Sequence, residues 1–124
     1  MAILRTGIDL VEIHRLSGLR PEIRQRFLDR VFTPREQADA GNSDASLAGR
    51  FAVKEAVSKA LGTGIGALGW QQIEVVRGLH GEPVLHLYGN ARVEAERQGL
   101  TVWSISISHT RTYAVAVAVA TDAQ

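Results

Sequence analysis

The sequence contains no cysteine among its 124 residues. Disulfide bonds, thiolate metal sites and cysteine nucleophiles are therefore excluded, and a reducing compartment such as the cytoplasm is the natural setting. No segment approaches the roughly 20 apolar residues that a membrane-spanning helix needs, and the N-terminus lacks the pattern of a signal peptide. We therefore expect a cytoplasmic protein without a membrane partner, in which oxygen or imidazole binds any metal ion.

An excess of charge of one sign is also absent, since the formal net charge is only +1. A nearly neutral chain has no general attraction for nucleic acid, and the basic segment is not interleaved with exposed aromatic residues, so we expect no nucleic-acid partner. The arginines are nevertheless concentrated between residues 15 and 35: Arg15, Arg20, Arg24, Arg26, Arg30 and Arg35. This segment predicts a basic patch, and hence an acidic partner.

The helical signals are local and clear. The longest apolar pattern runs over Ser46–Leu61 and covers more than half of the helix surface, which predicts a central, mostly buried helix that ends at Gly62. Thr33 is followed by Pro34 and, three residues on, by Glu36, which is the pattern of a capping box at a helix start. Shorter helices are expected after residue 9, around residues 23–31 and around residues 90–98.

Extended segments are predicted at residues 3–8, 72–77, 84–88 and 100–108, and the clearest strand pair closes the sequence. Its first strand alternates serine with large apolar residues, and after a turn at His109–Thr112 the second alternates valine with alanine. We expect the small alanine face to let the central helix approach closely. The sequence therefore predicts one α+β domain over residues 1–124, with the central helix packed on an antiparallel β-sheet.

Two carboxylates are candidates for a metal site. Asp9 follows the first predicted strand and Glu55 lies on the restricted polar face of the central helix, and Mg²⁺ binds well to one or two carboxylates together with substrate phosphates. Each residue also has a structural interpretation. Asp9 and Glu12 have the spacing of a capping box, and Glu55 and Lys59 have that of an ion pair within one helix.

Cationic residues surround Glu55 in the sequence. Arg50, Lys54 and Lys59 suit phosphate oxygens, although a solvated helix face also explains them. His109, in the final turn, suits a hydrogen bond to a ligand or to the turn itself. The other three histidines have no spacing typical of metal ligands.

Four segments carry a family resemblance: residues 7–13 (GIDLVEI), 32–36 (FTPRE), 49–64 (GRFAVKEAVSKALGTG) and 106–110 (SISHT). In order and spacing they resemble the holo-acyl-carrier-protein synthases, the small trimeric bacterial type in the 4'-phosphopantetheinyl transferase superfamily. The resemblance implies a transferase of fatty acid biosynthesis that moves 4'-phosphopantetheine from coenzyme A to a serine of apo-acyl carrier protein and releases 3',5'-ADP. It also implies a homotrimer with active sites at the subunit interfaces.

The same resemblance assigns site residues. Asp9 and Glu55 would hold Mg²⁺, Lys54 would assist beside them, and either Glu55 or a metal-associated water would accept the serine proton. Coenzyme A would contact Arg50, Phe51, Ser58, Lys59, Gly62, Gly64, Pro83, His109 and Thr110. The acidic carrier protein would dock on Arg15, Leu19, Arg24, Arg26 and Phe27. The competing hypothesis is a non-catalytic adaptor that binds a nucleotide or an acidic protein through its basic face.

Overall fold

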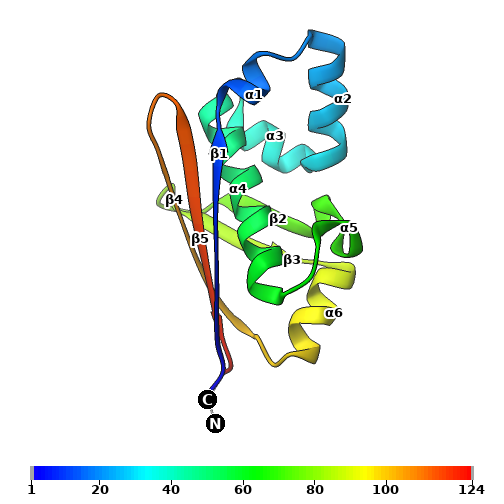
Figure 1. Cartoon of the computed structure of the whole chain (residues 1–124), viewed down its shortest axis with the longest axis vertical. Helices are drawn as coiled ribbons and strands as arrows, with labels where there is room; N and C mark the ends of the chain where they lie inside the picture. Colours follow the sequence, from blue (N-terminus) through cyan, green and yellow to red (C-terminus); the bar gives the residue numbers. More distant parts are fainter. Residues whose placement is uncertain (1, 124) are drawn as a thin grey trace.

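A computed structural model describes residues 2–123 of the chain (Figure 1). The elements in order are β1 (Leu4–Glu12), α1 (His14–Ser17), α2 (Pro21–Val31), α3 (Pro34–Ala40), α4 (Asp44–Leu61), α5 (Ile65–Leu68), η1 (Trp70–Gln72), β2 (Ile73–Arg77), β3 (Pro83–Leu87), α6 (Gly89–Arg97), β4 (Val102–His109) and β5 (Tyr113–Thr121). The strands form two antiparallel sheets, one in the order β1-β5-β4 and one made of β2 and β3. No helix in this described part is long and apolar enough to cross a membrane.

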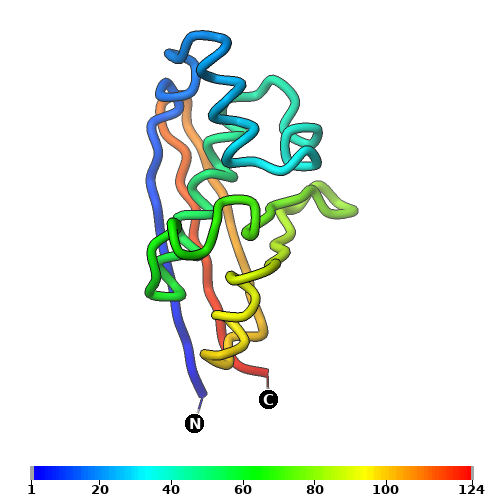
Figure 2. Tube along the Cα trace, turned by 90° about the vertical axis from the view of Figure 1, so that its right-hand side faces the viewer, coloured from blue at the N-terminus to red at the C-terminus, as the bar shows by residue number. Residues whose placement is uncertain are grey.

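Helix α4 packs against one face of the three-stranded sheet, as Figures 1 and 2 show. The alanines of β5 face this helix and are at most 1% exposed: Ala114, Ala116, Ala118 and Ala120. On β1, a Cβ atom added at Gly7 would lie only 1.9 Å from the carbonyl oxygen of Ala56 on α4. The predicted α+β fold, with the central helix on the small-residue face of an antiparallel sheet, is confirmed.

The predicted start of α3 and the predicted end of α4 are also confirmed. The Thr33 hydroxyl accepts a hydrogen bond from the Glu36 amide, and the Glu36 carboxylate accepts one from the Thr33 amide, so α3 begins with a complete capping box. Helix α4 begins two residues before the predicted start, because the Ser43 side chain caps it. It ends at Gly62, which has a left-handed φ of 75°.

The first strand differs from the prediction. β1 continues through Glu12, because β5 offers antiparallel partners as far as Tyr113. Asp9 therefore lies within the strand, opposite Ala116, and the interpretation of Asp9 as a helix cap is wrong. The helix expected after residue 9 is reduced to the single turn α1, His14–Ser17.

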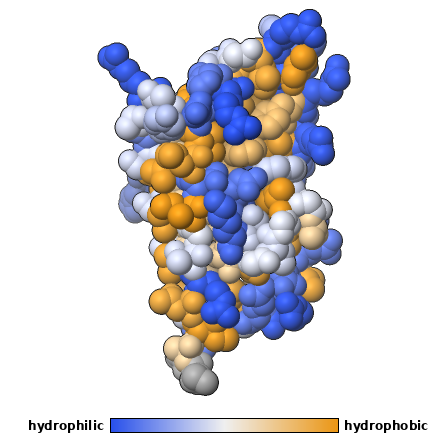
Figure 3. All heavy atoms as spheres, in the orientation of Figure 1, coloured by the Kyte–Doolittle hydropathy of each residue, from blue (hydrophilic) through white to orange (hydrophobic). Residues whose placement is uncertain are grey.

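The outer face of the three-stranded sheet carries exposed apolar side chains on β1 and β5, whereas β4 presents mainly serines there. Large side chains exposed on its strands are Leu4, Ile8, Leu10, Val102 and Tyr113. The alternation of β1 and β5 places Ile8 opposite Val117 and Leu10 opposite Val115 on this face. Figure 3 shows apolar atoms at the surface along the side of the molecule where the sheet lies.

Candidate functional site

Asp9 and Lys59 join β1 to α4. The alternation of β1 turns Asp9 toward the helix, on the same side as Gly7 and Val11, and leaves its side chain 18% exposed. The Lys59 ammonium donates to Asp9 Oδ1 at 3.1 Å and to the carbonyl oxygen of Ile8 at 2.9 Å. The close approach of strand and helix at Gly7 thus brings a carboxylate and an ammonium group together at the surface.

Glu55 lies one helical turn before Lys59. Burial raises the pKa of Glu55, the negative charge of Asp9 raises it further, and Lys59 opposes both effects. The expected ion pair between Glu55 and Lys59 does not form within residues 2–123, because Lys59 reaches across to Asp9. Two carboxylates therefore share one electrostatic environment, and a single ammonium group lies beside them.

This pair of carboxylates fits a hard divalent cation. The described residues contain no cluster of three or more histidines, cysteines or acidic side chains that could hold a metal ion alone. Two carboxylates that repel one another suit Mg²⁺, which completes its coordination with water and substrate phosphates. Asp9 and Glu55 therefore fit a metal site that is incomplete without an anionic ligand.

Further predicted site residues lie on this same side of α4. Residues 55, 58, 59 and 62 follow the spacing of one helix face. The Ser58 hydroxyl donates to the carbonyl oxygen of Glu55 at 2.7 Å, which turns it back on the helix. Gly62 caps α4 and Gly64 precedes α5, and a Cβ atom at either glycine would meet nothing within 4 Å. Their backbone is therefore open to the approach of a ligand.

Arg50 lies on another side of α4. It is five residues before Glu55, which is a rotation of about 140° around the helix. Its side chain is 7% exposed, and its Nε donates to the carbonyl oxygen of Val75 at 3.1 Å. Arg50 and Pro83 line one cavity of about 240 Å³ together with Ser46, Val75, Arg77, Gly81, Glu82 and Ile107.

His109 and Thr110 lie at the end of β4. His109 is exposed and falls two residues after Ile107, so it lies on the same strand face. The Thr110 hydroxyl accepts hydrogen bonds from the amides of Thr112 and Tyr113 and thereby closes the β4–β5 turn. These two residues extend the Arg50 side of the molecule rather than the Asp9 side.

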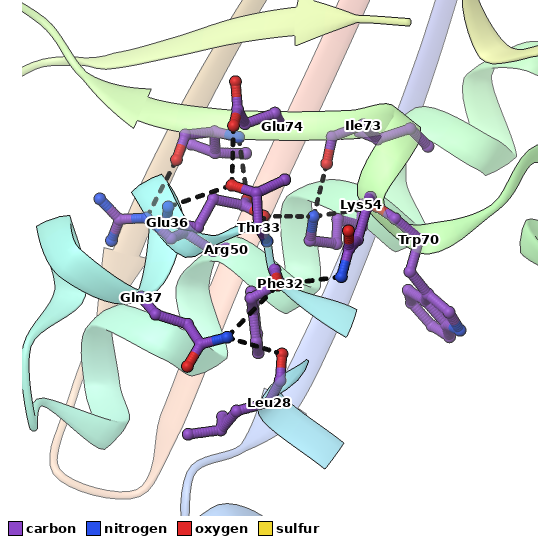
Figure 4. Close-up of polar contacts among 12 residues, drawn as sticks. Leu28, Phe32, Thr33, Glu36, Gln37, Arg50, Lys54, Trp70, Ile73 and Glu74 are labelled. Atoms are coloured by element: carbon purple, nitrogen blue, oxygen red, sulfur yellow. Dashed lines mark hydrogen bonds and ion pairs between the residues drawn. The ribbon is translucent and has the colours of Figure 1, made fainter. Parts of the chain in front are cut away.

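Lys54 does not join the carboxylates of Asp9 and Glu55. It is fully buried, and its ammonium donates to Glu36 Oε1 at 2.8 Å and to the carbonyl oxygens of Trp70 and Ile73 (Figure 4). All three donor positions of an ammonium group are thereby used. Lys54 thus links α4 to α3 and to the start of β2.

Glu36 is the residue that sequence reasoning missed. Besides capping α3 and binding Lys54, its Oε2 accepts the amide of Val75 at 2.9 Å. The neighbouring Glu74 accepts the hydroxyl of Thr33 at 2.7 Å (Figure 4). The capping-box pattern located Glu36 at the helix start, but no local signal indicates a buried partner 18 residues away.

The predicted carrier-docking residues divide into two groups. Arg15, Leu19 and Phe27 line an apolar cavity of about 230 Å³ with Val11, Leu16 and Phe51. Phe51 stacks on Trp70 with ring centroids 5.0 Å apart, which holds its ring at the cavity wall. Arg24 instead forms an ion pair with Asp44 at the start of α4, while Arg26 is exposed on α2.

The chain is similar to known proteins over nearly its whole length. Residues 5–118 match the 4'-phosphopantetheinyl transferase superfamily. A holo-[acyl-carrier-protein] synthase of Gloeobacter violaceus is 47% identical over 116 residues, which cover 90% of this chain and 88% of the relative. That of Natranaerobius thermophilus is 41% identical over 94% of this chain and 96% of the relative.

Solved structures with the same fold include two that are complexes with coenzyme A. The holo-[acyl-carrier-protein] synthase of Helicobacter pylori, in complex with coenzyme A, superposes with a TM-score of 0.83 at 33% identity, covering 93% of this chain and 98% of that one. The Bacillus anthracis synthase, in complex with coenzyme A (3',5'-ADP), has a TM-score of 0.78 at 31% identity and covers 99% of this chain and 100% of that one.

Proposed function

Since this chain belongs to the 4'-phosphopantetheinyl transferase superfamily, we propose that it is a holo-acyl-carrier-protein synthase. It transfers 4'-phosphopantetheine from coenzyme A to a serine of an apo-acyl carrier protein, and residues 1–124 form its single domain. The similarity to named synthases over more than nine-tenths of the chain supports this activity. The observation that carries it is the meeting of Asp9, Glu55 and Lys59 where β1 crosses α4.

The reaction sets two demands on the protein. The serine hydroxyl forms a new oxygen–phosphorus bond at the β-phosphate, the bond from that phosphorus to the oxygen of 3',5'-ADP breaks, and the hydroxyl proton passes to a base. Negative charge on the diphosphate must be balanced, and the reacting groups must be held in line. Asp9 and Glu55 hold Mg²⁺ in this proposal, and the metal ion supplies charge neutralisation at the diphosphate when bound.

Lys59 supplies a second positive charge at the same place. Its side chain is 53% exposed, so its ammonium group would be accessible to a phosphate oxygen of the diphosphate. The open backbone at Gly62 and Gly64 adds room for the nucleotide beside it. The positive charge of Lys59, its hydrogen-bond donors and the open backbone at Gly62 and Gly64 thus favour the binding of a diphosphate at this surface.

We propose that the protein is a homotrimer, and the separation of the site residues supports an active site shared between subunits. Arg50 and Pro83 line a cavity on a different side of α4 from Asp9 and Glu55, so one coenzyme A molecule meets both groups most readily where two subunits adjoin. The exposed apolar side chains on the outer face of the three-stranded sheet, among them Ile8 on the edge strand β1, support such association. Each active site then combines the metal side of one subunit with the Arg50 side of its neighbour.

Acyl carrier protein is the second substrate, and we propose the α1–α2 surface as its docking site. Arg15 and Arg26 provide charge, while Leu19 and Phe27 line an apolar cavity next to Phe51. An acidic partner would gain association rate from the arginines and affinity from the apolar cavity. Arg24 contributes less directly, because Asp44 already pairs with it.

Intact-mass spectrometry tests the proposal. The purified chain is incubated with coenzyme A and apo-acyl carrier protein, with Mg²⁺ and with a chelator in its place. We expect the carrier to gain the mass of one phosphopantetheine group only when Mg²⁺ is present. Carrier binding that is indifferent to Mg²⁺ and leaves the carrier mass unchanged would favour the non-catalytic adaptor instead.

A further inference from the structure

The C-terminal end of α4 is held by the residue that follows α6. The Gln98 side chain donates through Nε2 to the carbonyl oxygen of Leu61 at 2.7 Å, although 37 positions separate the two residues. Leu61 is the last residue of α4, and the last carbonyl groups of a helix have no partner within the helix. Gln98 therefore supplies a donor at the point where the chain leaves α4 for Gly62.

A second hydrogen bond orients the Gln98 amide. Nε2 also donates to Oε1 of Glu94 at 2.7 Å, one helical turn earlier on α6. Arg97 donates to both oxygens of Glu94, at 2.6 Å and 3.0 Å. The hydrogen bonds from Arg97 and Gln98 lower the pKa of Glu94 to about 2, so the carboxylate is ionised in neutral solution. Both neighbours of Nε2 are acceptors, and this arrangement fixes which way the amide points.

Helix α6 is fixed in the core by other contacts. Ala91 and Ala95 are at most 3% exposed, and the Ala91 amide donates to Oε1 of Gln72 at 3.1 Å. After the helix, the Leu100 amide donates back to the carbonyl oxygen of Ala95 at 2.9 Å. Because these contacts place α6 without the Gln98 side chain, the hydrogen bond from Gln98 restrains the end of α4.

The segment next to this hydrogen bond is the turn Gly62–Gly64. The amides of Gly62 and Thr63 donate to the carbonyl oxygens of Lys59 and Ser58, each at 3.1 Å. The Thr63 hydroxyl is buried and has no hydrogen-bond partner within residues 2–123, so it does not help to hold the turn. Glycine backbone has many alternative conformations, and a fixed peptide beside it reduces their number. Gln98 thus provides the side-chain restraint that the turn itself lacks.

We propose that Gln98 is a positioning residue for the binding of coenzyme A: it fixes the peptide between Leu61 and Gly62 and so orders the turn before the nucleotide arrives. This inference rests on the proposed function, in which the nucleotide lies beside Lys59 and the exposed backbone of Gly62–Gly64. Gln98 acts through the Leu61 carbonyl and does not itself touch the substrate. An ordered turn loses less conformational entropy on binding, which increases affinity.

Steady-state kinetics of Gln98→Met test this role, because methionine keeps the length of the side chain and removes its donors. We expect the KM for coenzyme A to rise on the order of fivefold, as for one lost hydrogen bond, while kcat stays within about twofold. The KM for the carrier protein should not change. Glu94→Ala, which removes only the orienting partner, should give a smaller rise. Arg92→Gln breaks an exposed ion pair with Glu96 on the same helix and is the matched control.

Amide hydrogen exchange of the intact protein without ligand gives the second readout. The amides of Gly62 and Thr63 should exchange faster in Gln98→Met than in the wild type, while those of β5 keep their rates. Unchanged exchange at the turn, an unchanged KM for coenzyme A, or an equal rise in the KM for the carrier would each overturn the inference. If the wild type transfers no group to a carrier, the proposed function fails, yet exchange and isothermal titration with coenzyme A still decide whether Gln98 orders the turn for binding.

Discussion

The ammonium nitrogen of Lys59 lies 3.1 Å from Oδ1 of Asp9, although 50 positions separate the two residues. Gly7, two residues before Asp9 on the same strand face, is what lets β1 and α4 come this close. The site therefore depends on a backbone contact as much as on its charged side chains. Substitution of the carboxylates should therefore lower transfer activity, whereas substitution of Gly7 should lower stability.

The two carboxylates should be separable from the fold. Asp9→Asn and Glu55→Gln remove one charge each with little change in shape, so we expect transfer to fall by at least about a hundredfold while thermal unfolding is little altered. Glu12→Gln is the control, because Glu12 lies on the same strand but faces outward. Near-normal turnover by either site variant would show that the pair does not hold the catalytic cation.

Gly7→Ala should destabilise the protein by about 3 kcal/mol or more, at the upper end of overpacking. Its Cβ would lie 1.9 Å from the carbonyl oxygen of Ala56, and neither backbone is free to move alone. In Gly49→Ala the nearest atom is Cγ2 of Ile107 at 2.7 Å, a side-chain atom that is able to shift. Urea unfolding should therefore rank Gly7→Ala well below Gly49→Ala in stability.

The buried pair of Lys54 and Glu36 should carry a large share of stability. Lys54→Met leaves the Glu36 carboxylate without its cation, and we expect a loss of about 3–5 kcal/mol. The double variant Glu36→Gln/Lys54→Met should lose less than the sum of the single variants, since no charge is then left unpaired. Denaturant unfolding of all four proteins gives the coupling energy, and strictly additive losses would contradict the pairing.

Arg26→Glu tests carrier docking more directly than Arg24→Glu does. The exposed Arg26 should affect the association rate, with an effect that fades at high salt. Arg24→Glu would place a second acidic group against Asp44, so it should also lower thermal stability. Stopped-flow binding at low and high salt separates these effects, and a salt-independent loss with Arg26→Glu would move the docking surface elsewhere.

The apolar face of the sheet tests the trimer. Ile8→Glu places a charge among the exposed apolar side chains of β1 on that face, and we expect the variant to run as a monomer in size-exclusion chromatography with light scattering. Transfer activity should fall with it, because each site then lacks the Arg50 side of a neighbour. Leu79→Glu is the control on the β2–β3 turn, where Leu79 is 94% exposed. A wild-type protein that is itself monomeric would refute the assembly.

Local sequence patterns determined much of this protein. The capping box at Thr33, the left-handed end of α4 at Gly62 and the alternation along β4 and β5 each depend on residues within a few positions of one another. Hydrogen bonds and steric limits of that range act on any chain that carries them. For this reason the central helix, the closing strand pair and the α+β class could be predicted from the amino-acid sequence alone.

The tertiary structure alone decided the partners of the charged residues. Lys54 and Lys59 lie five positions apart on α4, and helical rotation says only that they face different ways. The tertiary fold pairs Lys54 with Glu36 and Lys59 with Asp9. β1 likewise runs past Asp9 because β5 lies alongside it. Which distant carboxylate meets which ammonium group depends on packing between elements, and no local pattern encodes it.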